Sequence, residues 1–193
     1  MYKAALKYGP ITLTAADNLL GSLCREIIGQ QLSGKVAATI YERFQELFRS
    51  KYPTPKEILE VKDQNLRDVG MSWAKVKSLK DLAINILEQK LDLEKLKNEN
   101  NEAVVLQLTK IKGIGPWTAE MFLMFALGRE DVFSPSDLGL RNAVFKLYNL
   151  NEKLSNEKLL NMSYHWAPYR TYASIILWRS LDNFTPPGKK DRN

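Results

Sequence analysis

The sequence predicts an all-α protein of about eight to ten short helices. Apolar residues recur at the three- and four-residue spacing that places them on one helix face, as in Leu19, Leu20, Leu23, Cys24, Ile27 and Ile28. Alternating apolar and polar runs, which are typical of half-buried strands, are nearly absent. Residues that favour helix starts precede several of the apolar segments, and this supports the same fold class.

Taken in order, the first two expected helices carry the apolar positions of 19–28 and 36–48. The next begins at Thr54-Pro55-Lys56-Glu57, which combines an N-cap threonine, a proline at the first helical position and a capping-box glutamate. Ser72 is expected to cap a longer helix that reaches Leu87, and Asn101 to cap another that ends near Leu108. Further helices are expected from Pro116 and near 137–148, 155–162 and 168–181.

Length and composition restrict the classes of protein to which the chain can belong. Its 193 residues suit one domain or two tightly packed lobes, and 45% hydrophobic residues can form a buried core. One cysteine excludes an internal disulfide framework and a four-cysteine zinc or iron–sulfur site, and one histidine argues against histidine-rich metal sites. The net charge of +6 favours a polyanionic partner such as nucleic acid.

The chain shows no readable secretory signal at its start, so an intracellular protein is expected. That means the cytoplasm in a prokaryote and the nucleus in a eukaryote. The apolar run Met121–Leu127 is far shorter than the ~20 residues that span a bilayer, so no membrane insertion is expected. The polar tail 186–193 is expected to be mobile.

The segment 108–119, called the hairpin below, is the most informative part of the sequence. One helix ends there, Gly113 and Gly115 flank Ile114, and a new helix begins at Pro116. Glycines let backbone N–H groups approach a phosphate closely, and a helix N-terminus favours an anion. Lys110 and Lys112 add positive charge, and Ile114 is expected to point inward and hold the turn. An ordinary loop between two helices is the alternative.

The hairpin and three other patches resemble the helix-hairpin-helix DNA glycosylase superfamily, within it the DNA-3-methyladenine glycosylase II branch. The other patches, in the family's order, are Ile27–Ser33, Val132–Leu140 and Trp166–Ala173. The resemblance covers roughly residues 20–180 and implies two helical lobes with a cleft between them as the active site. Lobe one would span about 25–132, and lobe two about 1–24 plus 133–185. Without the β-rich amino-terminal domain of larger members, this would be a minimal form.

By this resemblance, Asp137 is the catalytic residue, placed at the junction of the lobes. Cleavage of an N-glycosidic bond builds positive charge on the sugar, which a carboxylate stabilises. Whether Asp137 also activates water stays open, and its alternative role is to cap the helix that follows. Relatives that cut the backbone have a lysine at the position of Trp117, so no lyase activity is expected here.

The resemblance also implies roles for residues that bind the base and the DNA. Trp117 and Tyr169 would line the base pocket, although Trp117 also suits a packing role and Tyr169 lies in a stretch that suits a helical core. The implied DNA-binding residues are Gln30, Gln31, Lys112, Gly113, Gly115 and Thr118. Gln31 stands where some members have an apolar wedge, and the alternative for both glutamines is a solvated helix end.

Main-chain carbonyls of Thr109, Ile111 and Gly113 would hold a structural monovalent cation, and no other cofactor is expected. Cys24 and His165 are expected to be structural. The implied activity is flipping and hydrolytic excision of alkylated purines, such as 3-methyladenine or 7-methylguanine, from double-stranded DNA by a monomer. The alternatives are a non-catalytic helix-hairpin-helix DNA-binding module and a glycosylase for another lesion.

Overall fold

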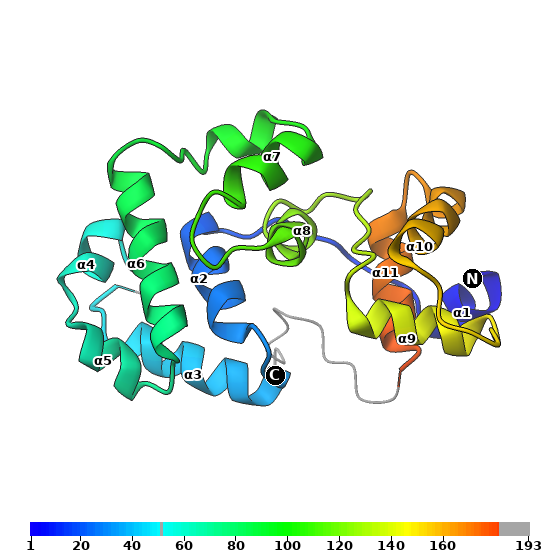
Figure 1. Cartoon of the computed structure of the whole chain (residues 1–193), viewed down its shortest axis with the longest axis horizontal. Helices are drawn as coiled ribbons and strands as arrows, with labels where there is room; N and C mark the ends of the chain where they lie inside the picture. Colours follow the sequence, from blue (N-terminus) through cyan, green and yellow to red (C-terminus); the bar gives the residue numbers. More distant parts are fainter. Residues whose placement is uncertain (51, 182–193) are drawn as a thin grey trace. The chain divides into compact units, whose positions relative to one another are not determined.

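The computed structural model describes residues 1–50 and 52–181, and every regular element in these ranges is helical (Figure 1). The all-α prediction is therefore confirmed. The α-helices are α1 Tyr2–Tyr8, α2 Leu19–Gly29, α3 Gly34–Glu46, α4 Pro55–Glu60, α5 Asp63–Asp68, α6 Trp73–Leu87, α7 Asn101–Leu108, α8 Pro116–Phe125, α9 Leu138–Leu147, α10 Asn156–Ser163 and α11 Arg170–Arg179. Two 3₁₀ helices, η1 Lys95–Asn98 and η2 Tyr164–Trp166, complete the described elements.

The chain divides into two compact units. Unit 1 combines Met1–Ala15 with the described residues from Gly128 onward, and unit 2 is Ala16–Leu127. The unit boundaries lie at 15/16 and 127/128, whereas the resemblance implies lobe boundaries near 24/25 and 132/133. The difference has a physical cause at each end. The helix α2 packs on α3, α6 and α8, and it lies entirely in unit 2. The segment 129–132 bonds to α11, because Thr171 Oγ1 accepts from the Val132 N–H at 3.0 Å and donates to the Arg129 carbonyl at 2.6 Å.

Unit 2 is built around α2, whose apolar face packs against its neighbours. Leu23, Ile27 and Ile28 are fully buried, and α6 packs on α2, α4 and α5. The predicted start of α4 is confirmed: Thr54 and Glu57 form a reciprocal capping box with Pro55 in the first turn. Unit 2 thus has a core in which α2 and α6 each contact several of the other helices.

Unit 1 is centred on α11. This helix packs on α9 and on α1, and Leu140, Val144 and Leu177 are fully buried. Arg170 and Asp131 form a bidentate ion pair with N···O distances of 2.7 and 2.9 Å. This pair connects the start of α11 to the segment before α9. The α9–α11 pair is the part of unit 1 that positions Asp137.

Two α-helices, the two 3₁₀ helices and one cap differ from what the sequence predicts. The short helices α1 and α5 are not predicted, because each buries one residue, Ala4 and Leu66 respectively, and shows no apolar periodicity. Tertiary contacts hold them instead, as when Arg179 donates to the Tyr8 carbonyl at the end of α1. The cap of α7 is Asn100 rather than Asn101, since the Asn100 side chain accepts from the Ala103 N–H at 2.8 Å. The predicted mobile tail, 186–193, lies outside the described residues.

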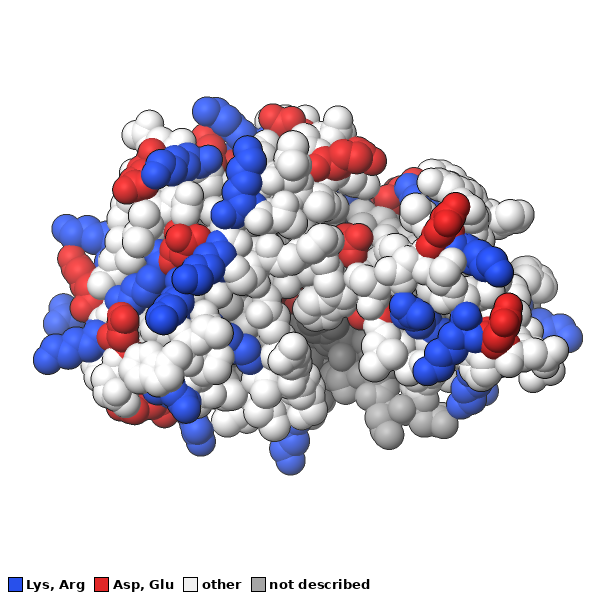
Figure 2. Space-filling model, in the orientation of Figure 1, with Lys and Arg blue, Asp and Glu red and all other residues white. Residues whose placement is uncertain are grey.

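The surface shows how the net positive charge is distributed. On the face drawn in Figure 2, the Lys and Arg side chains of unit 2 are interleaved with Asp and Glu side chains. The excess of positive charge is therefore spread over this face rather than gathered in one patch. In the described part of the chain, no helix combines the length and apolar character needed to cross a membrane.

Candidate functional site

The hairpin has the form that the sequence predicts. Its turn is closed by bonds from the Ile111 N–H to the Leu108 carbonyl, 3.0 Å, and from the Ile114 N–H to the Ile111 carbonyl, 3.1 Å. Ile114 is 4% exposed, which confirms that it points inward. The hairpin therefore leads directly into the N-terminus of α8, where Gly115 is the N-cap and Pro116 stands in the first turn.

The presence of glycine is explained differently at the two hairpin positions. Gly113 has φ +81°, and a Cβ there would lie 2.0 Å from Ser78 Oγ, so the fold itself requires glycine. Gly115 has φ −95° and ψ 175°, and a Cβ there would meet nothing within 4 Å. The protein's own packing thus gives no reason for glycine at 115, and its bare backbone allows close approach from outside.

Around the hairpin, the predicted DNA-binding residues differ in exposure. Lys112 has an exposed side chain, and its backbone N–H donates to Asp81 Oδ2 at 2.7 Å. Thr118 is 2% exposed, and its hydroxyl accepts from Gln30 Nε2 at 3.0 Å. The Thr118 side chain accordingly lies inside unit 2, and its backbone in the first turn of α8 is the part suited to an anion.

The two glutamines after α2 are placed differently from one another. Gln30 Nε2 donates to the Gly113 carbonyl at 2.9 Å as well as to Thr118, so its amide nitrogen points at the hairpin. Gln31 is exposed and has φ +57°, a left-handed conformation that is uncommon outside glycine. Non-glycine residues in this conformation concentrate at functional sites. Gln31 is thus the glutamine whose side chain is presented to solvent.

The carbonyls predicted to hold a monovalent cation are partly engaged in hydrogen bonds. The Gly113 carbonyl accepts from Gln30, and the Ile111 carbonyl accepts from Ile114. A carbonyl oxygen has two lone pairs, so one hydrogen bond uses only part of the acceptor capacity of each oxygen. Among the described residues, no cluster of three or more His, Cys, Asp or Glu side chains could hold a metal ion.

Asp137 is the N-cap of α9 and is 9% exposed. Its Oδ1 accepts from the Leu140 N–H at 2.7 Å and from Trp178 Nε1 at 2.9 Å. The capping role left open by the sequence is thus present. Two donors on one oxygen fix the orientation of the whole carboxylate, and the helix N-terminus favours its negative charge.

Two residues that support Asp137 are missed by the sequence analysis. Trp178 on α11 is 5% exposed and donates to the carboxylate. A Cβ on Gly139 would lie 3.0 Å from Asp137 Oδ1 and 3.0 Å from Trp178 Nε1, so glycine leaves room for this bond. The sequence signal for Gly139 is a glycine inside the first turn of a helix, where it otherwise weakens the helix.

The predicted base-pocket residues belong to different units. Trp117 is half-buried in the first turn of α8 in unit 2. Tyr169 precedes α11 in unit 1, is 58% exposed, and lies edge-on to Tyr172 with ring centroids 6.1 Å apart. An exposed aromatic face of this kind can stack on a base.

Two titratable groups on α2 are shifted by their surroundings. Burial raises the pKa of the Cys24 thiol to about 12, which agrees with the prediction of a structural cysteine. Burial also raises the pKa of Glu26 to about 7, opposed by the positive charge of Arg25. The single histidine, His165, lies exposed on η2.

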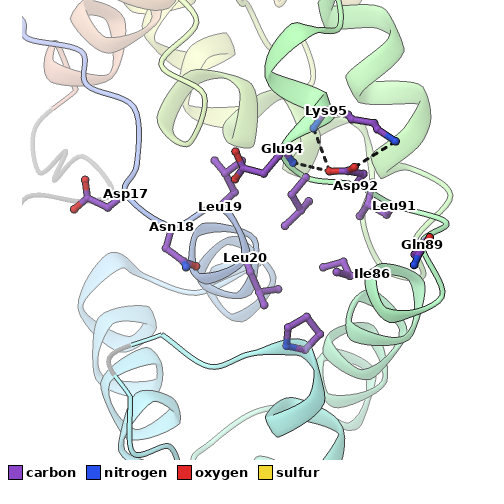
Figure 3. Close-up of a pocket in the computed structure, with 12 residues that line it drawn as sticks. Asp17, Asn18, Leu19, Leu20, Ile86, Gln89, Leu91, Asp92, Glu94 and Lys95 are labelled. Carbon is purple, nitrogen blue, oxygen red and sulfur yellow. Dashed lines mark hydrogen bonds and ion pairs between the residues drawn. The ribbon is translucent and has the colours of Figure 1, made fainter.

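A cavity of about 500 Å³ lies elsewhere in unit 2, between the start of α2 and the segment 89–95 (Figure 3). Two of its polar side chains serve local structure: Asn18 caps α2, and Asp92 accepts from the N–H groups of Glu94 and Lys95 at 3.1 and 3.2 Å. Of the described residues predicted for the site, none lines this cavity. We therefore assign it no part in the site.

The sequence matches known proteins over most of its length. It is 40% identical over 162 residues to the "Putative DNA-3-methyladenine glycosylase YfjP" of Bacillus subtilis, covering 81% of this chain and 56% of that protein. It is 37% identical over 172 residues to "DNA-3-methyladenine glycosylase 1" of Schizosaccharomyces pombe, covering 86% of this chain and 74% of that protein. The chain thus spans little more than half the length of the first of these relatives.

The chain is also similar to solved structures and matches a family description. A 3-methyladenine DNA glycosylase from Schizosaccharomyces pombe, solved in complex with abasic DNA, has a TM-score of 0.86 at 32% identity, covering 96% of this chain and 93% of that one. A DNA-3-methyladenine glycosidase from Bacillus halodurans has a TM-score of 0.81 at 36% identity, covering 93% and 82%. Residues 24–168 match the family described as "HhH-GPD superfamily base excision DNA repair protein". The chain belongs to the HhH-GPD superfamily.

Proposed function

We propose that this protein is a monofunctional DNA glycosylase that extrudes alkylated purines from duplex DNA and removes them by hydrolysis, leaving an abasic site. The observation that carries the proposal is the Asp137 carboxylate, which is held at the N-terminus of α9 by Leu140 and Trp178. The relatives named as DNA-3-methyladenine glycosylases support the substrate class.

The chemistry follows from the leaving group. A purine methylated on a ring nitrogen carries positive charge, so breaking the bond from C1′ to the base sends the electron pair to the base and releases it neutral. The sugar then carries the positive charge of an oxocarbenium ion. A fixed carboxylate stabilises that charge as it develops. Water adds at C1′ and loses a proton, which completes the abasic product.

Trp117 supports the monofunctional part of the proposal. Strand cleavage by a lyase requires an amine that forms a Schiff base with C1′, and an indole has no such amine. Its electron-rich face suits contact with a cationic purine instead. Tyr169, with its exposed ring, is proposed for the same kind of contact in unit 1.

The hairpin and Gln31 are proposed to hold the DNA. Bare backbone at Gly115 and the start of α8 suit a backbone phosphate, and the exposed Lys112 adds charge. Gln31 is proposed to enter the minor groove and fill the space that the extruded nucleotide leaves. A monovalent cation on the hairpin carbonyls would serve only to stabilise the turn. One copy of the chain is enough for this mode of binding.

The test is excision by wild type and by Asp137→Asn. The amide oxygen of asparagine keeps an acceptor for Leu140 and Trp178 but removes the negative charge. We expect single-turnover release of 7-methylguanine from a defined duplex to fall by about 100-fold or more. Asp92→Asn, a matched carboxylate that also accepts backbone N–H groups in unit 2, is expected to keep full activity.

Alkali treatment separates this proposal from a non-catalytic DNA-binding module. Wild type should create alkali-labile sites in methylated duplex DNA, and it should produce no strand breaks before alkali is added. A folded wild-type protein that binds DNA but releases no base from a panel of single-lesion duplexes would overturn the proposal. Release of only a deaminated or oxidised base would instead change the substrate class.

A further inference from the structure

The Gln30 side chain joins two elements that are distant in sequence. Its Nε2 donates to the Gly113 carbonyl at 2.9 Å and to Thr118 Oγ1 at 3.0 Å, across 83 and 88 residues respectively. A side-chain amide nitrogen has two N–H donors, and both are engaged in these bonds. Both donors of Gln30 are therefore directed to the hairpin.

Lys75 on α6 holds the backbone of the same loop. Its Nζ donates to the carbonyls of Ile28 and Gln30, each at 2.8 Å. These carbonyls lie at the C-terminal end of α2, where the helix leaves acceptors unpaired and where positive charge is favoured. Gln31 follows directly, with φ +57°. The loop that presents Gln31 is thus fixed through its main chain by α6 and through Gln30 by the hairpin.

The same face of α6 also holds the hairpin. Asp81 Oδ2 accepts from the Lys112 N–H at 2.7 Å, and Ser78 packs where a side chain on Gly113 would stand. Lys75, Ser78 and Asp81 are spaced by three residues, which places them on adjacent turns of one side of the helix. One side of α6 therefore sets the positions of both the hairpin and the loop of Gln31.

We propose that Gln30 is a positioning residue that keeps the Gln31 loop in register with the phosphate-binding hairpin, so that backbone binding and nucleotide extrusion occur at the same step of the duplex. This inference rests on the proposed glycosylase function. It replaces the sequence-based expectation that Gln30 itself binds DNA: Gln31 contacts the duplex, and Gln30 determines where Gln31 stands. A small displacement of a positioning group lowers rates strongly although it makes no contact with the substrate.

The test compares Gln30→Met, Thr118→Val and the double variant. Methionine keeps the length of the side chain and lacks both N–H donors, and valine keeps the shape of threonine and lacks the acceptor. Three quantities are measured: the equilibrium dissociation constant for an undamaged duplex, the fluorescence of 2-aminopurine placed beside the lesion as a signal of extrusion, and the single-turnover rate of 7-methylguanine release.

We expect Gln30→Met to lower extrusion and excision by about 10-fold or more, with the dissociation constant for undamaged DNA within about twofold of wild type. Thr118→Val should cause a smaller loss in wild type and almost none in the Gln30→Met background, because the bond is already gone. Thr118→Ser keeps the hydroxyl and should therefore lose less extrusion and excision than Thr118→Val. Gln31→Ala should lower extrusion in the wild-type background, and by less in the Gln30→Met background, because Gln31 is already displaced there.

Other outcomes overturn the inference. Equal losses of undamaged-duplex affinity and excision in Gln30→Met would show that Gln30 binds DNA directly. Losses that multiply fully with Thr118→Val would show that the bond between these two side chains does not carry the effect. Unchanged extrusion would show that the contact serves stability alone. Gln30→Glu, which also lacks the donors and keeps a polar end, replaces Gln30→Met if that variant is unfolded at the assay temperature. Absence of base release by wild type would refute the proposed function instead, and the coupling would then be judged from extrusion.

Discussion

Trp178 Nε1 donates a hydrogen bond of 2.9 Å to Asp137 Oδ1, and the two residues are 41 positions apart in the sequence. Because Trp178 is 5% exposed on α11, its indole is held by the core of unit 1 and holds the carboxylate in turn. The bond from Leu140 lies within the N-cap of α9, whereas the bond from Trp178 reaches the carboxylate from another helix. The pair therefore makes the orientation of Asp137 a property of the core.

Trp178→Phe tests this orientation. Phenylalanine fills most of the indole volume but has no N–H, so we expect single-turnover excision to fall by about 10-fold, which corresponds to the loss of one hydrogen bond to a charged group. Affinity for undamaged DNA should stay near the wild-type value. Equal excision by Trp178→Phe and wild type would show that the bond from Trp178 is not needed to orient Asp137.

Gly139→Ala should disturb the same pair from the other side. The new methyl group would stand 3.0 Å from Asp137 Oδ1 and 3.0 Å from Trp178 Nε1, so one of them must move. We expect at least a 10-fold loss of excision, consistent with misplacement by a few tenths of an ångström. Asn142→Ala, at an exposed position of the same helix, is the control and should leave both excision and thermal stability unchanged.

Replacing each hairpin glycine with alanine should separate an effect on stability from an effect on DNA binding. Gly113→Ala forces a Cβ against Ser78 at φ +81°, and it should lower the free energy of unfolding by about 2 kcal/mol or more. Gly115→Ala meets no neighbour, so it should change the free energy of unfolding by less than about 1 kcal/mol. It should nevertheless weaken duplex binding by about 10-fold, because the methyl group holds a phosphate away.

Chemical denaturation and fluorescence anisotropy with an undamaged duplex measure the two effects. A Gly115→Ala variant with wild-type DNA affinity would contradict the role given to its bare backbone.

Glu26 should make stability depend on pH. Burial raises the pKa of Glu26 to about 7 from 4.5, so the folded state binds more protons than the unfolded state between these values. Stability from this group is therefore fully present below the unfolded pKa and is lost as the pH rises through the folded value. The glutamine side chain in Glu26→Gln cannot ionise. The variant should therefore be more stable than wild type at pH 8 by about 1 to 3 kcal/mol.

At pH 4 the same variant and wild type should be nearly equal in stability. Melting temperatures at pH 4, 6 and 8 measure the difference, and a difference that is constant over this range would show that Glu26 ionises normally in the folded protein.

Local sequence signals predict much of the fold because their physics is local. The capping box of Thr54 and Glu57 joins residues three apart, and the buried stripe of α2 follows helical spacing. The same reason explains the errors: α1 and α5 are stabilised by contacts with α11 and α6, and those contacts leave no periodic pattern in short segments.

Motifs in the sequence point to the candidate site residues, but they do not show what each of these residues contacts. Gln30 and Gln31 are adjacent and chemically identical, yet one donates to the hairpin and the other is exposed. Gly113 and Gly115 also look alike in sequence, although only Gly113 has a neighbour that excludes a side chain.

By itself, the sequence determined the helical class, most helix starts, the hairpin turn and the carboxylate at the head of α9, since each depends on residues within about one turn of one another. Only the tertiary structure decided what each of these groups contacts. Trp178 reaches Asp137 across 41 residues and Gln30 reaches Gly113 across 83. Such bonds form because packed helices bring distant side chains within 3 Å, and no spacing along the chain encodes that distance.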